Sequence, residues 1–165
     1  MKEYKQISHE FPPVYDVNSK ILILGSFPSV KSREMQFYYG HPQNRFWKVL
    51  AAVLGDEIPT TIEEKKSFLL KHHIAVWDVI DRCSIQGSSD ATIKDVVVNN
   101  FDEILRNSAI STIFVNGNKA YELYCKYAEA QTGMKAIKLP STSPANAAWN
   151  LERLCSAWMK IIEVL

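Results

Sequence analysis

Two asparagines and a run of small polar residues are the groups in this sequence most able to hold a ligand by hydrogen bonding. Asn44 follows an aromatic loop, Asn116 precedes Gly117, and residues 141–146 read Ser-Thr-Ser-Pro-Ala-Asn. An asparagine side chain offers one acceptor oxygen and two donor N–H groups, so it can pair with the edge of a nucleobase. The loops around these residues carry no cluster of acids and histidines suited to a metal. They predict a site for a flat, neutral, hydrogen-bonding ligand, without a metal or another cofactor.

A loop of glycine, proline and aromatic residues is expected to form another wall of this site. Its first part, residues 25–29, is Gly-Ser-Phe-Pro-Ser, and its second part, residues 38–47, is Tyr-Tyr-Gly-His-Pro-Gln-Asn-Arg-Phe-Trp. Glycine and proline let the backbone come close to a ligand. The loop lacks the G-x-G-x-x-G pattern of dinucleotide sites and the G-x-x-x-x-G-K-[ST] pattern of nucleoside triphosphate sites. Neither of these ligand classes is therefore expected.

Short apolar strands alternating with helices must position these loops. Four strands are predicted over residues 20–25, 73–78, 111–116 and 136–139. Helices are predicted over residues 44–54, 61–71, 100–105, 119–130 and 146–164, whereas residues 1–20 and 83–90 are expected to be irregular. This alternation is typical of a layered α/β fold with a mostly parallel sheet, in which ligands bind beyond the carboxyl ends of the strands. The segments that follow the four strands are therefore expected to converge.

Composition narrows the class of protein further. The chain has 165 residues, of which 47% are hydrophobic, so we expect one domain over residues 1–165 with an irregular lead-in over 1–20. A net charge of +1 argues against binding a polyanion through bulk positive charge, so any contact with nucleic acid should be local. A local surplus of basic residues lies between positions 20 and 48 and consists of Lys20, Lys31, Arg33, Arg45 and Lys48 against Glu34.

The cysteines and the N-terminus predict a cytoplasmic protein. Cys83, Cys125 and Cys155 are far apart and form no C-x-x-C pair, which argues against a disulfide framework and a metal cage. We expect them to be small buried hydrophobic residues. The N-terminus lacks the apolar region of a signal peptide, and no apolar run approaches the roughly 20 residues of a membrane span. We therefore expect a protein without membrane contacts. We also expect a monomer.

Together these motifs resemble the uracil-DNA glycosylase superfamily from residue 21 to the end of the chain. The matching blocks are Gly-Ser-Phe-Pro-Ser, His-Pro-Gln-Asn-Arg-Phe-Trp, Ile-Phe-Val-Asn-Gly and Ser-Thr-Ser-Pro-Ala-Asn. The Asn-Arg-Phe-Trp-Lys-Val block also resembles the mismatch-specific uracil/thymine branch. The whole set, with residues 77–80 and the loop at 87–90, is most similar to the hypoxanthine-DNA glycosylase (DNA-deoxyinosine glycosylase) branch.

The resemblance implies a fold and an activity. The fold is a three-layer αβα sandwich around a central four-stranded, mostly parallel sheet. The activity is that of a monofunctional base-excision repair enzyme that flips a deaminated base, here hypoxanthine, out of DNA and hydrolyses its N-glycosidic bond. Such cleavage gives the sugar oxocarbenium character and the leaving base negative charge, so the protein must hold the base, polarise it and place one water.

Each candidate residue receives a role in this reaction. Asn44 and Asn116 are the candidate catalytic residues: Asn44 orients the water or bonds the developing charge, and Asn116 recognises the polar edge of the base. Phe46 is expected to stack on the base. The base pocket is completed by residues of the first loop, namely Ser26, Phe27, Pro28 and Ser29. DNA binding and intercalation are assigned to the last loop and one arginine, namely Ser141, Thr142, Ser143, Pro144, Ala145, Asn146 and Arg45.

Departures from the uracil-specific branch leave alternatives open. Phe27 and Ser29 stand where that branch has an Asp for the water and a Tyr that guards the pocket, and Ser141 stands where it has a His. These differences argue against strong uracil activity. A mismatch-specific uracil/thymine glycosylase and a non-catalytic module for nucleobases or single-stranded DNA remain alternatives. Either Asp78 or Asp90 could assist the water, and Asn44 could simply cap a helix.

Overall fold

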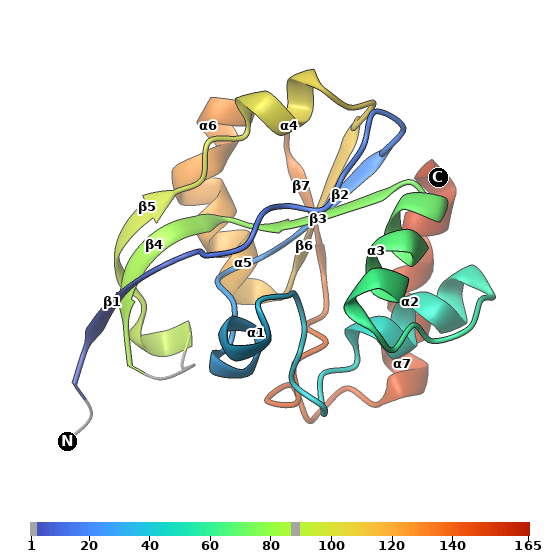
Figure 1. Cartoon of the computed structure of the whole chain (residues 1–165), viewed down its shortest axis with the longest axis horizontal. Helices are drawn as coiled ribbons and strands as arrows, with labels where there is room; N and C mark the ends of the chain where they lie inside the picture. The colour runs from blue at the N-terminus through green and yellow to red at the C-terminus, as the bar shows by residue number, and fades with distance from the viewer. Residues whose placement is uncertain (1–2, 87–89) are drawn as a thin grey trace.

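Two β-sheets and the helices around them make up the fold in the computed structural model, which describes residues 3–86 and 90–165 (Figure 1). The central sheet is parallel, in the order β3 (Ile74–Asp78), β2 (Ile21–Gly25), β6 (Thr112–Asn116) and β7 (Ala136–Leu139). The second sheet is antiparallel, in the order β1 (Lys5–Ser8), β4 (Ile80–Ile85) and β5 (Lys94–Val98). The helices are α1 (Val30–Met35), α2 (Phe46–Leu54), α3 (Ile62–Lys71), α4 (Asp102–Arg106), α5 (Asn118–Leu123), α6 (Glu129–Thr132) and α7 (Leu151–Trp158).

Helices cover both faces of the central sheet. In Figure 1, α2, α3 and α7 lie on one side of it and α5 and α6 on the other. A π-helical turn over Tyr124–Ala128 joins α5 to α6, and a 3₁₀ segment over Met159–Val164 continues α7. The predicted layered α/β fold with four parallel strands is therefore confirmed.

Alternation along β2 explains why this strand occupies the centre of the fold. All five of its residues are buried. Ile21 and Ile23 pack into the core beneath α2, α3 and α7, whereas Leu22 and Leu24 pack into the core on the opposite face. Successive side chains of a strand point to opposite faces, so an unbroken apolar run matches a strand buried on both sides.

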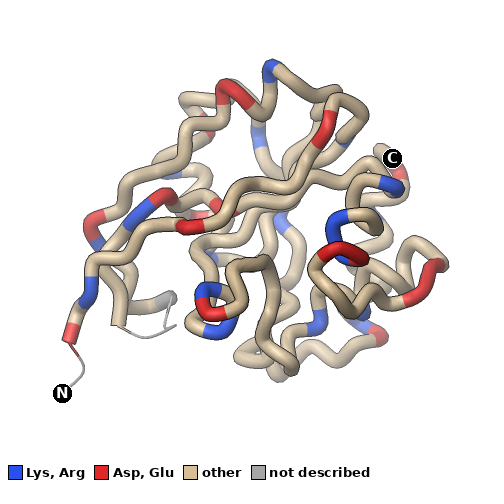
Figure 2. Tube along the Cα trace, in the orientation of Figure 1, with Lys and Arg blue, Asp and Glu red and all other residues tan. Residues whose placement is uncertain are grey.

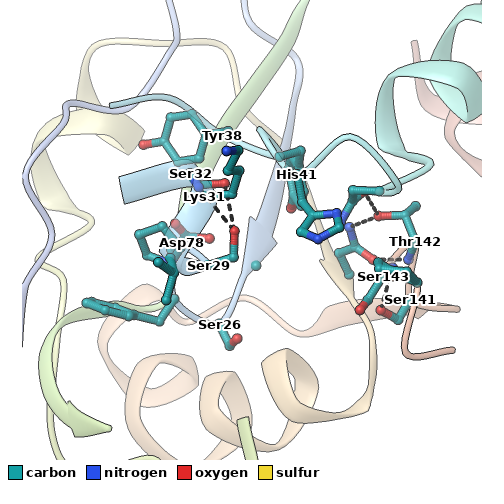
Figure 3. Close-up of a pocket in the computed structure, with 18 of the residues that line it drawn as sticks. Ser26, Ser29, Lys31, Ser32, Tyr38, His41, Asp78, Ser141, Thr142 and Ser143 are labelled. Atoms are coloured by element: carbon teal, nitrogen blue, oxygen red, sulfur yellow. Dashed lines mark hydrogen bonds between the residues drawn. The ribbon is translucent and has the colours of Figure 1, made fainter. Parts of the chain in front are cut away.

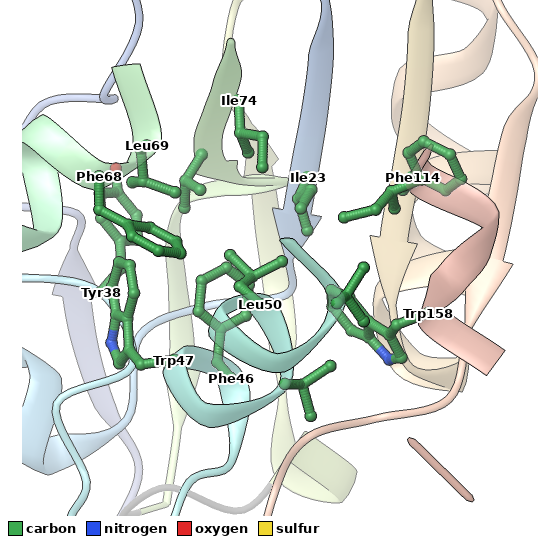
Figure 4. Packing of buried hydrophobic residues seen from close by; sticks show 14 of the residues in the cluster. Ile23, Tyr38, Phe46, Trp47, Leu50, Phe68, Leu69, Ile74, Phe114 and Trp158 are labelled. Carbon is green, nitrogen blue, oxygen red and sulfur yellow. The ribbon is translucent and has the colours of Figure 1, made fainter. Parts of the chain in front are cut away.

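Large aromatic rings fill the first of these cores (Figure 4). The rings of Phe46 and Trp158 are fully buried, with centroids 5.9 Å apart in an edge-to-face arrangement, and they join α2 to α7. Trp158 also donates its ring N–H to the carbonyl of Pro140 at 3.0 Å. The C-terminal helix is thereby tied to the loop that follows β7, which is one wall of the cavity described below.

The antiparallel sheet corrects the sequence-based prediction. The lead-in over residues 1–20 contains β1, the predicted loop over 83–90 begins inside β4, and β5 was not expected. These strands mix polar and apolar residues, as in Lys-Gln-Ile-Ser, so their local pattern is weak and their pairing across the chain defines them. The residues 87–89 that support the family resemblance lie outside the described part of the chain.

Two smaller expectations also change. The C-terminal helix begins at Leu151, with the Asn150 side chain accepting a hydrogen bond from the N–H of Arg153, and not at residue 146. Cys83 is buried as expected, but Cys125 is exposed and Cys155 is partly exposed. None of the helices among residues 3–86 and 90–165 is long and apolar enough to cross a membrane.

Charged residues of both signs are interspersed over the chain (Figure 2). The basic residues between positions 20 and 48 do not act as one group. Lys20 precedes β2, at the end of the strand opposite to the cavity, whereas Lys31 lines the cavity. The basic surplus read from the sequence is therefore spread over separate parts of the fold.

Candidate active site

A cavity of about 580 Å³ opens at the carboxyl ends of the central strands. This volume is in the range of small-molecule sites in proteins. Its walls come from the loops after β2, β3, β6 and β7, and Figure 3 shows Ser26, Ser29 and Asp78 across from His41 and Thr142. The predicted site residues that line it are Ser26, Phe27, Pro28, Ser29, Asn44, Asn116, Ser141, Thr142, Ser143, Pro144 and Ala145. The predicted convergence of these loops is confirmed.

A hydrogen-bonded chain through Thr142 connects the two asparagines. Asn116 Nδ2 donates to the Thr142 hydroxyl at 3.0 Å, and that hydroxyl donates to Asn44 Oδ1 at 2.8 Å. The backbone N–H of Thr142 donates to Asn116 Oδ1 at 3.1 Å, and the backbone N–H of Phe46 donates to Asn44 Oδ1 at 2.9 Å. Three segments far apart in the sequence are thereby fixed relative to one another.

The two backbone N–H groups determine which way both amides face. A backbone N–H can only donate, so Asn44 must turn its oxygen toward Phe46, and Asn116 must turn its oxygen toward Thr142. The Thr142 hydroxyl then accepts from Asn116 and donates to Asn44. Both lone-pair positions of Asn44 Oδ1 are occupied, so its Nδ2 amino group is the part left for a ligand. Asn44 is therefore a donor on the cavity wall, and its oxygen accepts the N–H of Phe46, the first residue of α2, whose N-cap is Arg45.

Thr142 lies where it cannot enter a DNA duplex. Its side chain is fully buried. The assignment of Thr142 to an intercalating wedge is therefore wrong for this conformation, because the hydroxyl is enclosed between the two asparagines. Pro144 and Ala145, two and three residues further on, are exposed in the same loop.

Arg45 also has a different role from the one predicted. Its guanidinium donates to the carbonyl oxygens of Ser143 at 2.9 Å, of Asn146 at 3.2 Å, and of Trp149. Asn146 closes the same loop by donating from Nδ2 to the carbonyl of Ser141 at 2.9 Å. Arg45 therefore holds the loop after β7 in shape, and its guanidinium is directed at the protein and not at a phosphate.

Phe46 lies beneath the cavity and does not line it. Its ring is fully buried, and the ring of Tyr39 stacks on it with centroids 3.9 Å apart. Direct stacking of Phe46 on a base, as predicted from the sequence, does not fit this arrangement because Tyr39 covers it and itself lines the cavity. Spacing alone could not distinguish a core ring at the start of a helix from a ring in a binding site.

The buried position of Phe46 makes a testable prediction. We expect Phe46→Ala to lower the free energy of unfolding by about 3–5 kcal/mol, because it removes a ring from a close-packed core. Urea unfolding followed by tryptophan fluorescence measures this change. A loss below about 1 kcal/mol would indicate a ring that is not part of the core.

A buried acid on β3 lines the cavity and has a partner that the sequence did not reveal. The last residue of β3 is Asp78, whose side chain is 5% exposed, and its Oδ2 lies 2.8 Å from His9 Nε2. His9 follows β1, in the segment expected to be irregular, and its ring packs against Phe11 and Tyr38. Asp78 itself could be placed at a strand end from the sequence, but nothing local marked His9 as its partner.

Close approach at Gly25 brings the first loop against this acid. A Cβ atom at Gly25 would lie 2.5 Å from Asp78 Oδ1, so any larger residue would displace the acid. Ser29, at the other end of the loop, caps α1 by accepting a hydrogen bond from the N–H of Ser32 at 3.2 Å. The backbone of residues 25–29 is thereby fixed along one wall of the cavity.

Metal ligation has no support from these side chains. Within residues 3–86 and 90–165, no group of three or more His, Cys, Asp or Glu is placed to hold a metal ion. His41 lines the cavity, but its Nδ1 accepts the backbone N–H of Gln43 at 3.1 Å and so shapes the turn before Asn44.

Comparison with known proteins identifies the family. The sequence profile of the uracil DNA glycosylase superfamily matches residues 12–162. A protein of Methanosarcina acetivorans named hypoxanthine DNA glycosylase is 38% identical over 151 residues, which cover 89% of this chain and 93% of that protein. A protein of Methanosarcina barkeri with the same name is 37% identical over 115 residues, or 68% of this chain and 72% of that protein.

A solved structure is similar over nearly the whole chain. It is a solution NMR structure of a candidate uracil DNA glycosylase from Methanosarcina acetivorans, with a TM-score of 0.78 and 36% identity, covering 92% of this chain and 93% of the other. The family profile spans most of the chain, and the first relative and this structure each cover about nine-tenths of it. The chain therefore belongs to the uracil DNA glycosylase superfamily.

Proposed function

We propose that this protein is a monofunctional DNA glycosylase of base excision repair that releases hypoxanthine from deoxyinosine in DNA. The observation that carries the proposal is the Asn44–Thr142–Asn116 chain, which presents amide groups to a cavity large enough for a purine. Relatives named hypoxanthine DNA glycosylase, at 37% and 38% identity, support this substrate.

Asn44 acts on the leaving base in this mechanism. The glycosidic bond breaks as negative charge moves onto the base, and a fixed N–H donor stabilises that charge without reorganising. Asn44 Nδ2 is such a donor, because Phe46 and Thr142 hold its oxygen. Between the two functions that the sequence left open for Asn44, this geometry favours bonding the developing charge over orienting the water.

Asn116 helps to hold the flipped base. After its bonds to Thr142, it retains one N–H and one lone-pair position for the polar edge of the base. The loop over residues 25–29 supplies the adjacent wall. Hydrolysis then needs one water on the far side of the sugar. The water oxygen bonds to C1′ as the C1′–N bond breaks, one of its protons is released to solvent, and the base leaves as an anion that takes up a proton from solvent.

The loop after β7 and one lysine contact the DNA at the mouth of the cavity in this proposal. Pro144 and Ala145, exposed in the loop after β7, are small and stiff enough to enter the space left by the flipped nucleotide. Arg45 supports this wedge by holding the carbonyls of Ser143 and Asn146. Lys31, on the opposite rim, is 49% exposed at its side chain and is placed to meet a backbone phosphate.

Base release from defined oligonucleotides tests this function. We expect duplexes with a single deoxyinosine to yield abasic sites, scored as strand breaks after alkali, faster than duplexes with deoxyuridine or a thymine mispaired with guanine. Faster release of uracil or thymine would replace hypoxanthine as the substrate. Binding to all of these duplexes with no abasic product from any of them would show a non-catalytic module instead.

A further inference from the structure

Two buried oxygens converge at the floor of the cavity beside Gly25. A Cβ atom built on this residue would lie 2.5 Å from Asp78 Oδ1 and 3.2 Å from the hydroxyl oxygen of Tyr39. Asp78 and Tyr39 both line the cavity. Their polar atoms therefore face the same small region, which only a glycine leaves open for a ligand.

The Tyr39 hydroxyl is buried, and its O–H donates to no acceptor in the described part of the chain. A buried O–H donor without an acceptor is costly, and a ligand that supplies the acceptor explains it. Tyr39 also has a backbone φ of 51°, an uncommon conformation for a residue with a side chain and one that is enriched at functional sites. Neighbouring Tyr38 cannot take this role, because its hydroxyl already donates to the carbonyl of Pro12 at 3.0 Å.

Burial and the nearby acid keep the Tyr39 hydroxyl protonated. Burial, followed by the negative charge of Asp78, raises the pKa of Tyr39 far above its usual range, and the Asn116 side chain offsets only part of this rise. The group is therefore an O–H donor at neutral pH.

His9 holds the acid so that one oxygen is left for a ligand. His9 Nε2 lies 2.8 Å from Asp78 Oδ2, and the side chain of His9 is only 3% exposed. The rings of Phe11 and Tyr38 enclose the imidazole, with centroids 4.6 and 5.8 Å away. Asp78 is thus fixed in one orientation, with Oδ1 toward Gly25 and the cavity.

We propose that Asp78 Oδ1 and the Tyr39 hydroxyl recognise a six-membered lactam, the acid accepting the ring N–H and the hydroxyl donating to the adjacent carbonyl oxygen. The inference rests on the proposed function, since it takes a flipped base as the ligand. The sugar of a flipped nucleotide stays at the mouth of the cavity, so the buried floor meets the edge of the base remote from the glycosidic bond.

This pairing distinguishes the deaminated base from its parent. Hypoxanthine has N1–H beside O6, whereas adenine has an acceptor at N1 beside a donor amino group at N6. Adenine would therefore place an acceptor against Asp78 and a donor against Tyr39. Sites built to hydrogen-bond one such pattern reject the other strongly, because their own buried groups are then left unpaired. His9 is a positioning residue in this arrangement, since it acts through Asp78.

A binding experiment in the Asn44→Ala background tests the inference separately from base release. The probes are duplexes with one deoxyinosine or one deoxynebularine, a purine nucleoside that lacks O6 and has an acceptor at N1. We expect the Asn44→Ala protein to bind the deoxyinosine duplex at least about tenfold more tightly than the deoxynebularine duplex. This ratio corresponds to the loss of one hydrogen bond to a charged group. Addition of Asp78→Asn or Tyr39→Phe should reduce this preference to about threefold or less.

Matched controls separate recognition from a structural effect. Asp56 and His72 form a second Asp–His pair, also at 2.8 Å, outside the cavity. Asp56→Asn should therefore leave the preference for deoxyinosine unchanged. His9→Phe should reduce the preference, and His9→Gln, which retains a donor for Asp78, should restore part of it.

Each outcome decides one question. If Asp78→Asn weakens binding of both duplexes equally, or changes neither, Asp78 does not recognise the lactam and the inference fails. If the preference falls as expected but the wild-type protein releases no base, the inference stands and the proposed catalytic function fails. An acid that only oriented the water would leave the binding preference intact.

Discussion

Replacement of Asn44 by Asp should lower the single-turnover rate of hypoxanthine release by about 10²–10³, the loss typical for a preorganised donor to a developing negative charge. The change keeps the oxygen that accepts from Phe46 and Thr142, but it replaces the Nδ2 donor by a second oxygen. That oxygen would face the negative charge of the leaving base. Asn44→Asp should therefore be at least as impaired as Asn44→Ala.

The comparison of these two variants separates the roles considered for Asn44. A residue that oriented the attacking water through an acceptor oxygen would work as well with a carboxylate, so an Asn44→Asp enzyme faster than Asn44→Ala would rule out the donor role. Since aspartate also caps helices well, the melting temperature of Asn44→Asp should stay close to that of the wild type. Deoxyinosine duplexes under single-turnover conditions provide the rate.

Removal of the Thr142 hydroxyl should produce the other large loss of activity. Thr142→Val keeps the shape of the side chain but removes the donor to Asn44 Oδ1 and the acceptor for Asn116 Nδ2. We expect a fall in kcat of about 10–100-fold, because both amides lose the bond that sets their orientation and small misplacements are costly in catalysis. The loss of these buried hydrogen bonds should also cost about 1–3 kcal/mol of stability.

Thr142→Ser is the matched control because it retains the hydroxyl. Its kcat should return to within a few-fold of the wild type, although it lacks the buried methyl group. Equal losses of kcat in the Val and Ser variants would show that Thr142 contributes packing alone. A loss confined to KM would place its effect on DNA binding and not on the reacting groups.

The central sheet could be predicted because its signal is local. The run at residues 21–25 is apolar throughout, and such a run forms a strand buried on both faces. In contrast, β1, β4 and β5 have mixed patterns, and pairing such as that of Lys5 with Ile85 defines them. Such pairing depends on residues far apart in the chain, so no window of sequence shows it.

In the candidate site, too, residue types could be predicted from the sequence, whereas long-range contacts could not. Asn44 and Asn116 could be chosen from residue type and from their position next to predicted strands or helices, because an amide is suited to a nucleobase wherever the fold places it. Residue type and position did not show which of the candidate side chains are buried or which groups they bond to. Thr142 was expected at the surface and Phe46 in the cavity, and the structure places both inside the protein.

Residue types and their local spacing were enough to predict the parallel sheet, the loops at its carboxyl ends and the amide chemistry of the site. The chemistry open to those groups depends on partners that the folded chain brings to them. It makes Asn44 a donor through Thr142, 98 positions away in the chain, and it turns Asp78 toward the cavity through His9, 69 positions away. The physical reason is that the direction of a hydrogen bond is fixed by its partners, and here the partners meet only when the chain has folded.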